Sequence, residues 1–280
     1  MGRRILTRAS HRELVLLSAI APPVRRGSTP RGTVQLAILM YHSLDASGSP
    51  VSIAPRTFER HLARLRDTGY AVLPLGEALA ASSAGQSQQP IAALTFDDGY
   101  ASVYDVAAPL LARFGWRATL FAVSDYLGSD NQWPGQASFV PPAQLLSWPQ
   151  LEELSHLGWE IGAHTRTHPD LTRLPTERIE AEVVGSKHVL EDRLGRAVDL
   201  FAYPSGRYDQ RVRSVVRGHF SAAVTTNMGW ASEMSPRDAL ERIEMWDFAR
   251  PGASRLLGSK LMAPYLTACR AARRLRRLGG

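Results

Sequence analysis

Cysteine is almost absent from this sequence: Cys269 is the only one among 280 residues. A single thiol excludes an internal disulfide and any zinc site built from several thiolates. Long apolar runs are also missing, because no segment reaches the roughly 18 apolar residues that cross a membrane. The run LVLLSAIA (14–21) is short, follows Glu13 and precedes two prolines. We therefore predict a cytoplasmic location, with secretion through a short signal peptide or peripheral membrane association as the alternatives.

A net positive charge is absent from the body of the chain, although the net charge of the whole chain is +7. Residues 1–33 carry +6 and residues 265–280 carry +5, which leaves −4 for residues 34–264. An enzyme that acts on nucleic acid usually places basic side chains along its working groove, so this distribution predicts no nucleic-acid partner. The basic ends could contact an anionic membrane, although a solvated tail is the simpler interpretation of the C-terminal one.

Three regions are predicted along the chain. They are a basic, disordered N-terminal tail over 1–33, one catalytic domain over 34–250, and a basic C-terminal helix or tail over 251–280.

Short apolar runs alternate with amphipathic segments from residue 34 onward. Strands are predicted at 36–41, 70–75, 91–96, 117–123, 159–164, 198–203, 220–226 and 242–246, and helices at 57–69, 104–115, 148–158 and 175–195. The small polar residues of 80–90 predict a loop. Continuous apolar runs are typical of parallel strands covered on both faces. About eight strands in about 210 residues favour an α/β fold with a closed or nearly closed barrel.

Polar residues follow four of these strands. They are His42, the pair Asp97 and Asp98, the segment HTRTH (164–168) and the segment PSG (204–206). Because the carboxyl ends of parallel barrel strands share one face, these groups should lie together. Two imidazoles four residues apart and a carboxylate form a three-ligand set for a divalent metal, with one position open for water. The alternative is a pair of surface histidines beside a capping aspartate.

These segments resemble the motifs of the polysaccharide deacetylases (NodB-homology domain, carbohydrate esterase family 4). TFDDGY (95–100) resembles the first motif, HTRTH the second, and FAYPSG (201–206) a variant of the third. The similarity extends over roughly 36–247. It implies a distorted (β/α)7-type barrel in a single NodB-homology domain. The implied reaction removes N-acetyl groups from a sugar, in a polysaccharide or an exopolysaccharide precursor.

The resemblance also implies a role for each matching residue. The implied ligands of one divalent metal ion are Asp98, His164 and His168. Zinc is the expected metal, with cobalt or nickel as alternatives. Asp97 would be the general base that acts on the activated water, and the backbone N–H of Ser205 would bind the oxyanion. The predicted substrate contacts are Tyr100, Pro204, Ser205 and Gly206.

Two features of the family are missing from this sequence. The arginine that holds the base in the third motif is replaced by Ala202, and the late Leu-x-His motif, whose histidine is the general acid, is absent. Apart from the implied metal ligands, His42 is the histidine that follows directly on a predicted strand, so we predict that it is the general acid. Arg242, on the last predicted strand, is the candidate for the missing arginine.

Two other functions stay open. One is a catalytically inactive barrel that binds carbohydrate, and the other is a metal-dependent amidohydrolase for a non-sugar acyl amide. A free base beside a metal set argues against the first. Trp133, Trp148, Trp230 and Trp246 could stack on sugar rings, which argues against the second, although tryptophans also pack in cores.

Overall fold

The computed structural model describes residues 36–84 and 87–278, with side chains up to residue 273. The predicted N-terminal tail therefore lies outside the described residues. The strands are β1 (Leu36–Tyr41), β2 (Ala71–Val72), β3 (Ile91–Phe96), β4 (Thr119–Ala122), β5 (Glu160–Ala163), β6 (Leu200–Ala202), β7 (Ala222–Met228) and β8 (Leu240–Glu244). The α-helices are α2 (Pro55–Asp67), α3 (Leu75–Ser83), α4 (Ala108–Ala112), α5 (Trp148–His156), α6 (Thr176–Leu194), α7 (Gln210–His219), α8 (Met245–Phe248) and α9 (Met262–Leu278). A π-helix η1 (Val103–Ala107) precedes α4, and the 3-10 helices are η2 (Ser124–Tyr126), η3 (Leu171–Arg173), η4 (Pro204–Gly206) and η5 (Ala253–Leu256).

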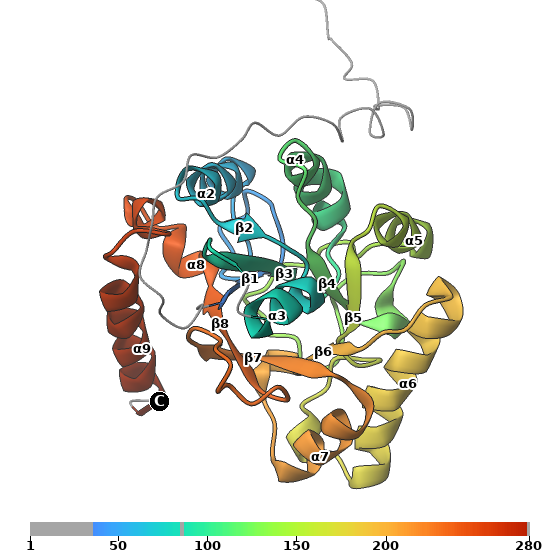
Figure 1. Cartoon of the computed structure of the whole chain (residues 1–280). Coiled ribbons are helices and arrows are strands. Elements are labelled where there is room, and N and C mark those ends of the chain that lie inside the picture. Colours follow the sequence, from blue (N-terminus) through green and yellow to red (C-terminus); the bar gives the residue numbers. More distant parts are fainter. Residues whose placement is uncertain (1–35, 85–86, 279–280) are drawn as a thin grey trace, which may run out of the picture.

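Seven of the strands form a closed ring of parallel pairings (Figure 1). Their order is β1-β8-β7-β6-β5-β4-β3, and β1 closes the ring because it pairs with β3 along its whole length. The short strand β2 pairs with the start of β3 and stands outside this ring. The α/β barrel of about seven strands predicted from the sequence is confirmed.

The strands of the ring are buried on both faces. In β1, Leu36 and Ile38 belong to the cluster that fills the barrel interior, whereas Leu39 and Tyr41 pack in the outer cluster under the helices. Neither face of such a strand meets water, which explains the continuous apolar runs of the sequence. The interior is tightly filled: a Cβ added at Gly162 would lie 2.4 Å from the ring of Phe121.

Helix α3 closes the amino-terminal end of the barrel and crosses in front of the strands in Figure 1. The N–H of Leu75 donates to Thr119 Oγ1 at 2.8 Å, and the N–H of Gly76 donates to Glu160 Oε2 at 2.8 Å. The predicted strand 70–75 is thus limited to two residues, and residues 80–83 of the predicted loop 80–90 are helix. Leu75, Ala78 and Leu79 are buried at helical spacing, and their packing on the barrel end adds to the stability of this short helix.

Helix α7 occupies a segment for which the sequence analysis predicted no element. The side chain of Asp209 accepts a hydrogen bond from the N–H of Val212 at 3.0 Å and caps the first turn. Val212 and Val216, one turn apart, are buried. Both signals are present in the sequence, since a capping aspartate before apolar residues at helical spacing marks a helix start.

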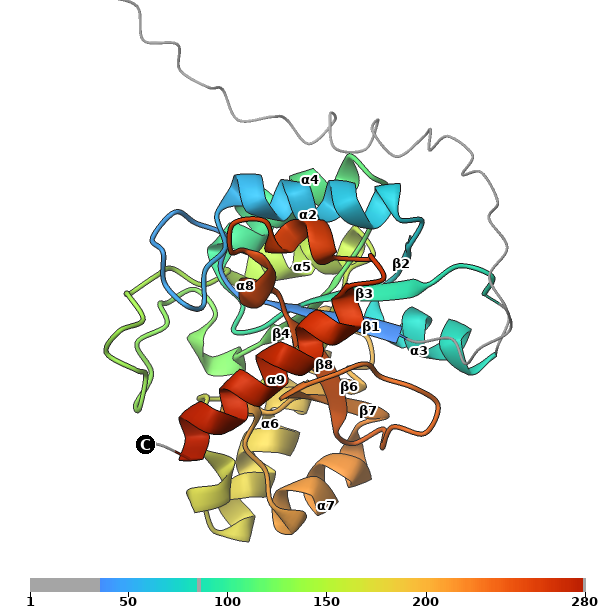
Figure 2. The same cartoon turned by 90° about the vertical axis from the view of Figure 1, so that its left-hand side faces the viewer.

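Helix α9 packs on the outside of the barrel, where it lies across β8 in Figure 2. Met262 and Leu266 are buried, and Arg273 Nη2 lies 2.9 Å from Asp247 Oδ2. The interpretation of the C-terminal segment as a solvated tail is therefore wrong for the described side chains. An arginine-rich helix still buries one apolar face when its charged heads reach past that face to acids on the barrel.

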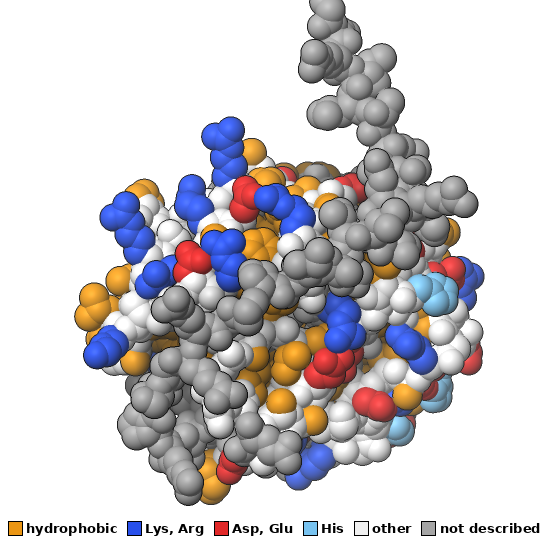
Figure 3. Space-filling model, turned by 45° about the horizontal axis from the view of Figure 1, so that its top comes forward, with side chains coloured by type: hydrophobic (Ala, Val, Ile, Leu, Met, Phe, Trp, Pro, Cys, Tyr) orange, Lys and Arg blue, Asp and Glu red, His pale blue; other side chains and the backbone are white. Residues whose placement is uncertain are grey.

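The surface gives two further observations. Among the described residues, no helix has the length and apolar content needed to cross a bilayer. On the coloured part of the face in Figure 3, Lys and Arg side chains stand among acidic and hydrophobic ones and form no continuous basic band.

Candidate active site

Three loops at the carboxyl ends of β3, β5 and β6 form the candidate site. All the non-glycine residues with positive φ in the described part of the chain lie in these loops. They are Asp98 (69°), Thr165 (67°), His168 (58°) and Ser205 (53°). A side chain in this conformation costs about 1–3 kcal/mol and persists only where its surroundings hold it. The concentration of such residues here indicates that the three loops are shaped for function.

The predicted metal ligands converge in the structure. Asp98, His164 and His168 each offer one ligand atom, and these atoms lie within 4.8 Å of one another. His164 Nε2 is 3.3 Å and His168 Nε2 is 3.5 Å from Asp98 Oδ1. His164 Nδ1 lies 2.8 Å from the carbonyl oxygen of Ala202, so Nδ1–H donates to this oxygen and Nε2 keeps its lone pair. This donor set fits a divalent metal ion.

The pKa values of Asp98, His164 and His168 are also shifted, by burial and by their close contact. Burial raises the pKa of Asp98, but the hydrogen bond with His164 and the charge of His168 bring it well below its usual range. Burial lowers the pKa of His168 to about 4, so its imidazole is neutral at neutral pH, as a metal ligand must be. Burial also lowers the pKa of His164, but its hydrogen bond with Asp98 and the nearby carboxylates raise it overall.

Asp97 is held by a buried arginine from the far end of the sequence. Arg242 Nη1 donates to Asp97 Oδ1 at 2.7 Å, and Nη2 donates to Oδ2 at 2.5 Å. Leu240 of β8 faces the barrel interior, so Arg242, two residues further, faces it as well. Burial raises the pKa of Asp97, but the charge and hydrogen bonds of Arg242 outweigh this and lower it. The carboxylate is thus ionised and fixed in orientation.

His42 lies beside this pair at the end of β1. Its Nε2 is 4.0 Å from Asp97 Oδ2, and its side chain is 18% exposed. Glu244 lies at the end of the neighbouring strand β8. Burial raises its pKa, and the charge of His42 offsets only part of this rise. The structure therefore brings His42, Asp97 and Arg242 to the same face of the barrel as the three metal-ligand candidates.

Comparisons with known proteins agree on one family. A model of the polysaccharide deacetylase family matches residues 84–220, which contain the whole of TFDDGY (95–100) and of HTRTH (164–168). The protein YxkH of Bacillus subtilis (strain 168), a polysaccharide deacetylase by name, is 29% identical over 213 residues, which are 75% of this chain and 71% of YxkH. Deacetylase PplD of Streptococcus pyogenes, solved in complex with acetate, is 27% identical with a TM-score of 0.69, over 81% of this chain and 98% of PplD. The match of the family model places residues 84–220 in the polysaccharide deacetylase family. A further solved member, BC0361 of Bacillus cereus, is 25% identical with a TM-score of 0.63, over 75% of this chain and 64% of BC0361.

The predicted substrate contacts of this deacetylase domain differ in their access to solvent. Tyr100 is 2% exposed, and its hydroxyl accepts a hydrogen bond from Asn131 at 3.2 Å, so its ring offers little surface to a sugar. Pro204 is buried as well, whereas Ser205 is exposed and Gly206 is half-buried. The accessible part of the third loop is therefore Ser205–Gly206.

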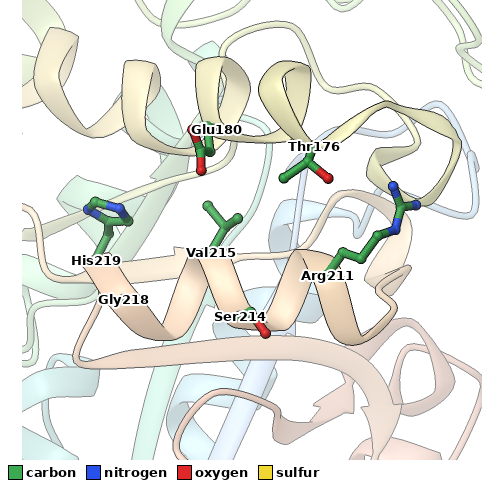
Figure 4. Close-up of a pocket in the computed structure, with 7 residues that line it drawn as sticks. All are labelled: Thr176, Glu180, Arg211, Ser214, Val215, Gly218 and His219. Atoms are coloured by element: carbon green, nitrogen blue, oxygen red, sulfur yellow. The ribbon is translucent and has the colours of Figure 1, made fainter.

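Two cavities open near the deacetylase loops and helices. One, of about 540 Å³, lies beside Ser205 and is lined by Asp170, Thr172, Arg173, Gly206, Arg207, Tyr208 and Asn227. The other, of about 480 Å³, lies between α6 and α7, where Thr176 and Glu180 face Val215 and His219 (Figure 4). Of the described residues that line this second cavity, none is a predicted site residue, so it belongs to the outer helical layer.

Two residues support the metal-ligand candidates in a way that the sequence analysis did not predict: Glu182, which it did not name, and Trp133, which it named only for stacking on sugar rings. The ring of Trp133 lies 4.5 Å from the ring of His168. Glu182 of α6 is 4% exposed and accepts hydrogen bonds from the backbone of residues 166–167. Its signal was available: Glu182 precedes Val183 within the buried stripe of the helix, and a buried acid needs polar partners.

Proposed function

We propose that this protein is a metal-dependent N-deacetylase that acts on an N-acetylated glycan, either a polysaccharide or a precursor of an exopolysaccharide. The observation that carries the proposal is the pair of adjacent carboxylates with separate partners. Asp98 faces the two imidazoles, whereas Asp97 is held by Arg242. One carboxylate is thus available to a metal and the other to a proton, as hydrolysis of an amide by activated water requires.

Asp98, His164 and His168 would hold one divalent metal ion, preferably zinc, with cobalt or nickel as alternatives. When bound, this ion supplies Lewis-acid chemistry that activates water and polarises the acetamide carbonyl.

The remaining steps use side chains of this chain. Asp97 takes one proton from the attacking water, whose oxygen bonds to the acetamide carbon. The backbone N–H of Ser205 donates to the oxygen that gains charge. His42 gives a proton to the amide nitrogen as the C–N bond breaks, so acetate and a free amine leave. Arg242 keeps Asp97 ionised and oriented.

A sugar substrate is supported by the cavity beside Ser205. Tyr208 offers an aromatic face there, and Asn227 Nδ2 donates to the Tyr208 hydroxyl at 3.2 Å. Arg207 Nη1 pairs with Asp170 Oδ2 at 2.6 Å on the same rim. Planar polar side chains around an aromatic ring suit hydroxyl-rich rings. Acetate is the small product of such a reaction, and PplD has been solved with acetate bound.

The test is acetate release from N-acetylglucosamine oligomers, the corresponding polymer and a lipid-linked N-acetyl sugar, each with and without a chelator. We expect release that stops with the chelator and returns with zinc. Asp98→Ala, His164→Ala and His168→Ala should each lose bound metal, whereas Asp97→Asn should keep the metal and lose turnover. If Asp97→Asn lost the metal and Asp98→Asn kept it, the division between the two carboxylates would be wrong.

The same assay separates the other two functions. Binding of sugars without acetate release would favour a carbohydrate-binding barrel, and hydrolysis restricted to non-sugar acyl amides would favour another amidohydrolase. His42→Ala should keep the metal and fall by about 10²- to 10⁴-fold in turnover, with loss of the alkaline limb of the pH profile. Near-normal turnover would remove His42 as the acid.

Location and membrane contact are also proposals. A cytoplasmic location is supported by the single cysteine, and peripheral membrane contact by the arginines of the two chain ends. Cosedimentation of the full chain with anionic and neutral vesicles tests the contact, which only the anionic vesicles should give.

A further inference from the structure

The loop that carries both histidine ligands has a demanding backbone. Thr165 and His168 have positive φ, at 67° and 58°, and are separated by two residues. Each is in a conformation that side chains with a Cβ avoid, at a cost of about 1–3 kcal/mol. The bond from the His168 N–H to Thr165 Oγ1, at 2.9 Å, closes the loop on itself but does not attach it to the barrel. Contacts from outside must therefore fix its position.

Glu182 provides such a contact. Its Oε2 accepts hydrogen bonds from the N–H groups of Arg166, at 3.0 Å, and Thr167, at 2.9 Å. Its Oε1 accepts a third from Thr167 Oγ1, at 2.8 Å. The residue is 4% exposed, so these bonds are shielded from water. A carboxylate that accepts several backbone N–H bonds binds them more strongly than a neutral acceptor does.

Helix α6 is shaped so that the loop can lie against it. Gly185 is three residues after Glu182 and thus on the same face of the helix. A Cβ added there would lie 2.9 Å from Cδ of Arg166. Glycine inside a helix costs about 1 kcal/mol relative to alanine, so the close approach of the loop gives a reason for it. On the other side, the N–H of Asp125 donates to the Arg166 carbonyl oxygen at 3.1 Å.

We infer that Glu182 is a positioning residue of the metal centre, which holds residues 165–168 so that the imidazoles of His164 and His168 face Asp98 together. This inference rests on the proposed metal-dependent function. Outer-shell partners that orient metal ligands typically change metal affinity by about 10- to 100-fold when they are replaced. Glu182 touches neither the metal-ligand atoms nor the proposed substrate side, so its effect should appear in metal binding before catalysis.

The test compares Glu182→Gln with Glu180→Gln, an exposed glutamate two positions earlier on the same helix. Zinc affinity of the metal-free full chain is measured by competition with a chromogenic chelator, and the visible spectrum of the cobalt form reports ligand geometry. We expect Glu182→Gln to bind zinc about 10- to 100-fold more weakly and to alter the cobalt spectrum, whereas Glu180→Gln should match the wild type in both.

Thr167→Val serves as a second variant if Glu182→Gln does not fold. It removes only the hydroxyl bond to Oε1, so it should weaken zinc binding by less than the loss of the whole carboxylate, and Thr167→Ser should restore wild-type binding. The inference would be overturned, but not the proposed function, if Glu182→Gln kept wild-type zinc affinity and an unchanged cobalt spectrum. The same holds for Thr167→Val if only that variant folds. A wild type that binds no zinc, cobalt or nickel would instead refute the proposed function, and this inference with it.

Discussion

Replacing Arg242 by glutamine should destabilise the protein and shift its pH profile. Arg242 is 1% exposed and Asp97 is 2% exposed. The arginine donates four hydrogen bonds. Two go to Asp97, the third goes from Nε to the carbonyl oxygen of Thr225 at 2.8 Å, and the fourth goes from Nη1 to Thr95 Oγ1 at 3.2 Å. Removal of one partner from a buried ion pair costs about 3–5 kcal/mol, because the other charge stays buried without compensation. We expect a loss of that size in the free energy of unfolding of Arg242→Gln at pH 7.

The sign of the pH effect follows from the lowered pKa of Asp97. The unfolded chain protonates this carboxyl near pH 3.9, above the pKa of the folded state. The ion pair therefore adds stability above that pH, and this contribution disappears as the pH falls through the folded-state pKa. Without Arg242, burial raises the pKa of Asp97, so the base is protonated at higher pH. The acid limb of the activity profile should move upward.

The measurement is urea unfolding of metal-free protein, together with turnover between pH 4 and pH 9. Exposed Arg255→Gln is the matched control and should change neither. In the double variant Arg242→Gln/Asp97→Asn the buried charge is gone, so part of the lost stability should return. A loss below 1 kcal/mol in Arg242→Gln, or no recovery in the double variant, would refute this account of the pair.

Other changes test the C-terminal helix, the third loop and a buried histidine. The buried Leu266 predicts that truncation to residues 34–264 lowers the urea midpoint and that Leu266→Ala costs about 2–5 kcal/mol; an unchanged midpoint would contradict the packing. Gly206→Ala adds a Cβ 2.0 Å from Thr226 Oγ1 at a φ of 67°, so turnover should fall and a second change, Thr226→Ala, should restore part of it. Burial lowers the pKa of His61 to about 4. Between about pH 6.5 and pH 4 the imidazole is therefore protonated in the unfolded chain but not in the folded protein. The free energy of unfolding should fall over this range by up to about 1.4 kcal/mol per pH unit as the pH decreases. The slope of stability against pH should be smaller in His61→Gln, and equal slopes in the two proteins would show that His61 does not cause it.

Apolar runs and the polar residues after them predict where the ring has its strands and which face carries the site, although residues 245 and 246 of the predicted strand 242–246 belong to helix α8. Residues 36–41 and 91–96 are strands with the predicted bounds, because an apolar run buried on both faces ends at the first titratable residue of the loop that follows. Asp97, Asp98 and His164 were found for the same reason. Each lies at the carboxyl end of a parallel strand, and a barrel gathers those ends on one face.

The sequence named Arg242 only as a candidate to hold Asp97, and the tertiary structure establishes that the two pair. Arg242 and Asp97 are 145 residues apart, and they meet because β1 closes the ring between β3 and β8. Local patterns encode the period of a strand or a helix, but they do not encode which distant side chain points across a barrel. Helix α9 shows the same limit: its arginines indicated a solvated tail, whereas Met262 and Leu266 are buried in the outer cluster and Arg273 pairs with Asp247, contacts that only the fold brings within reach.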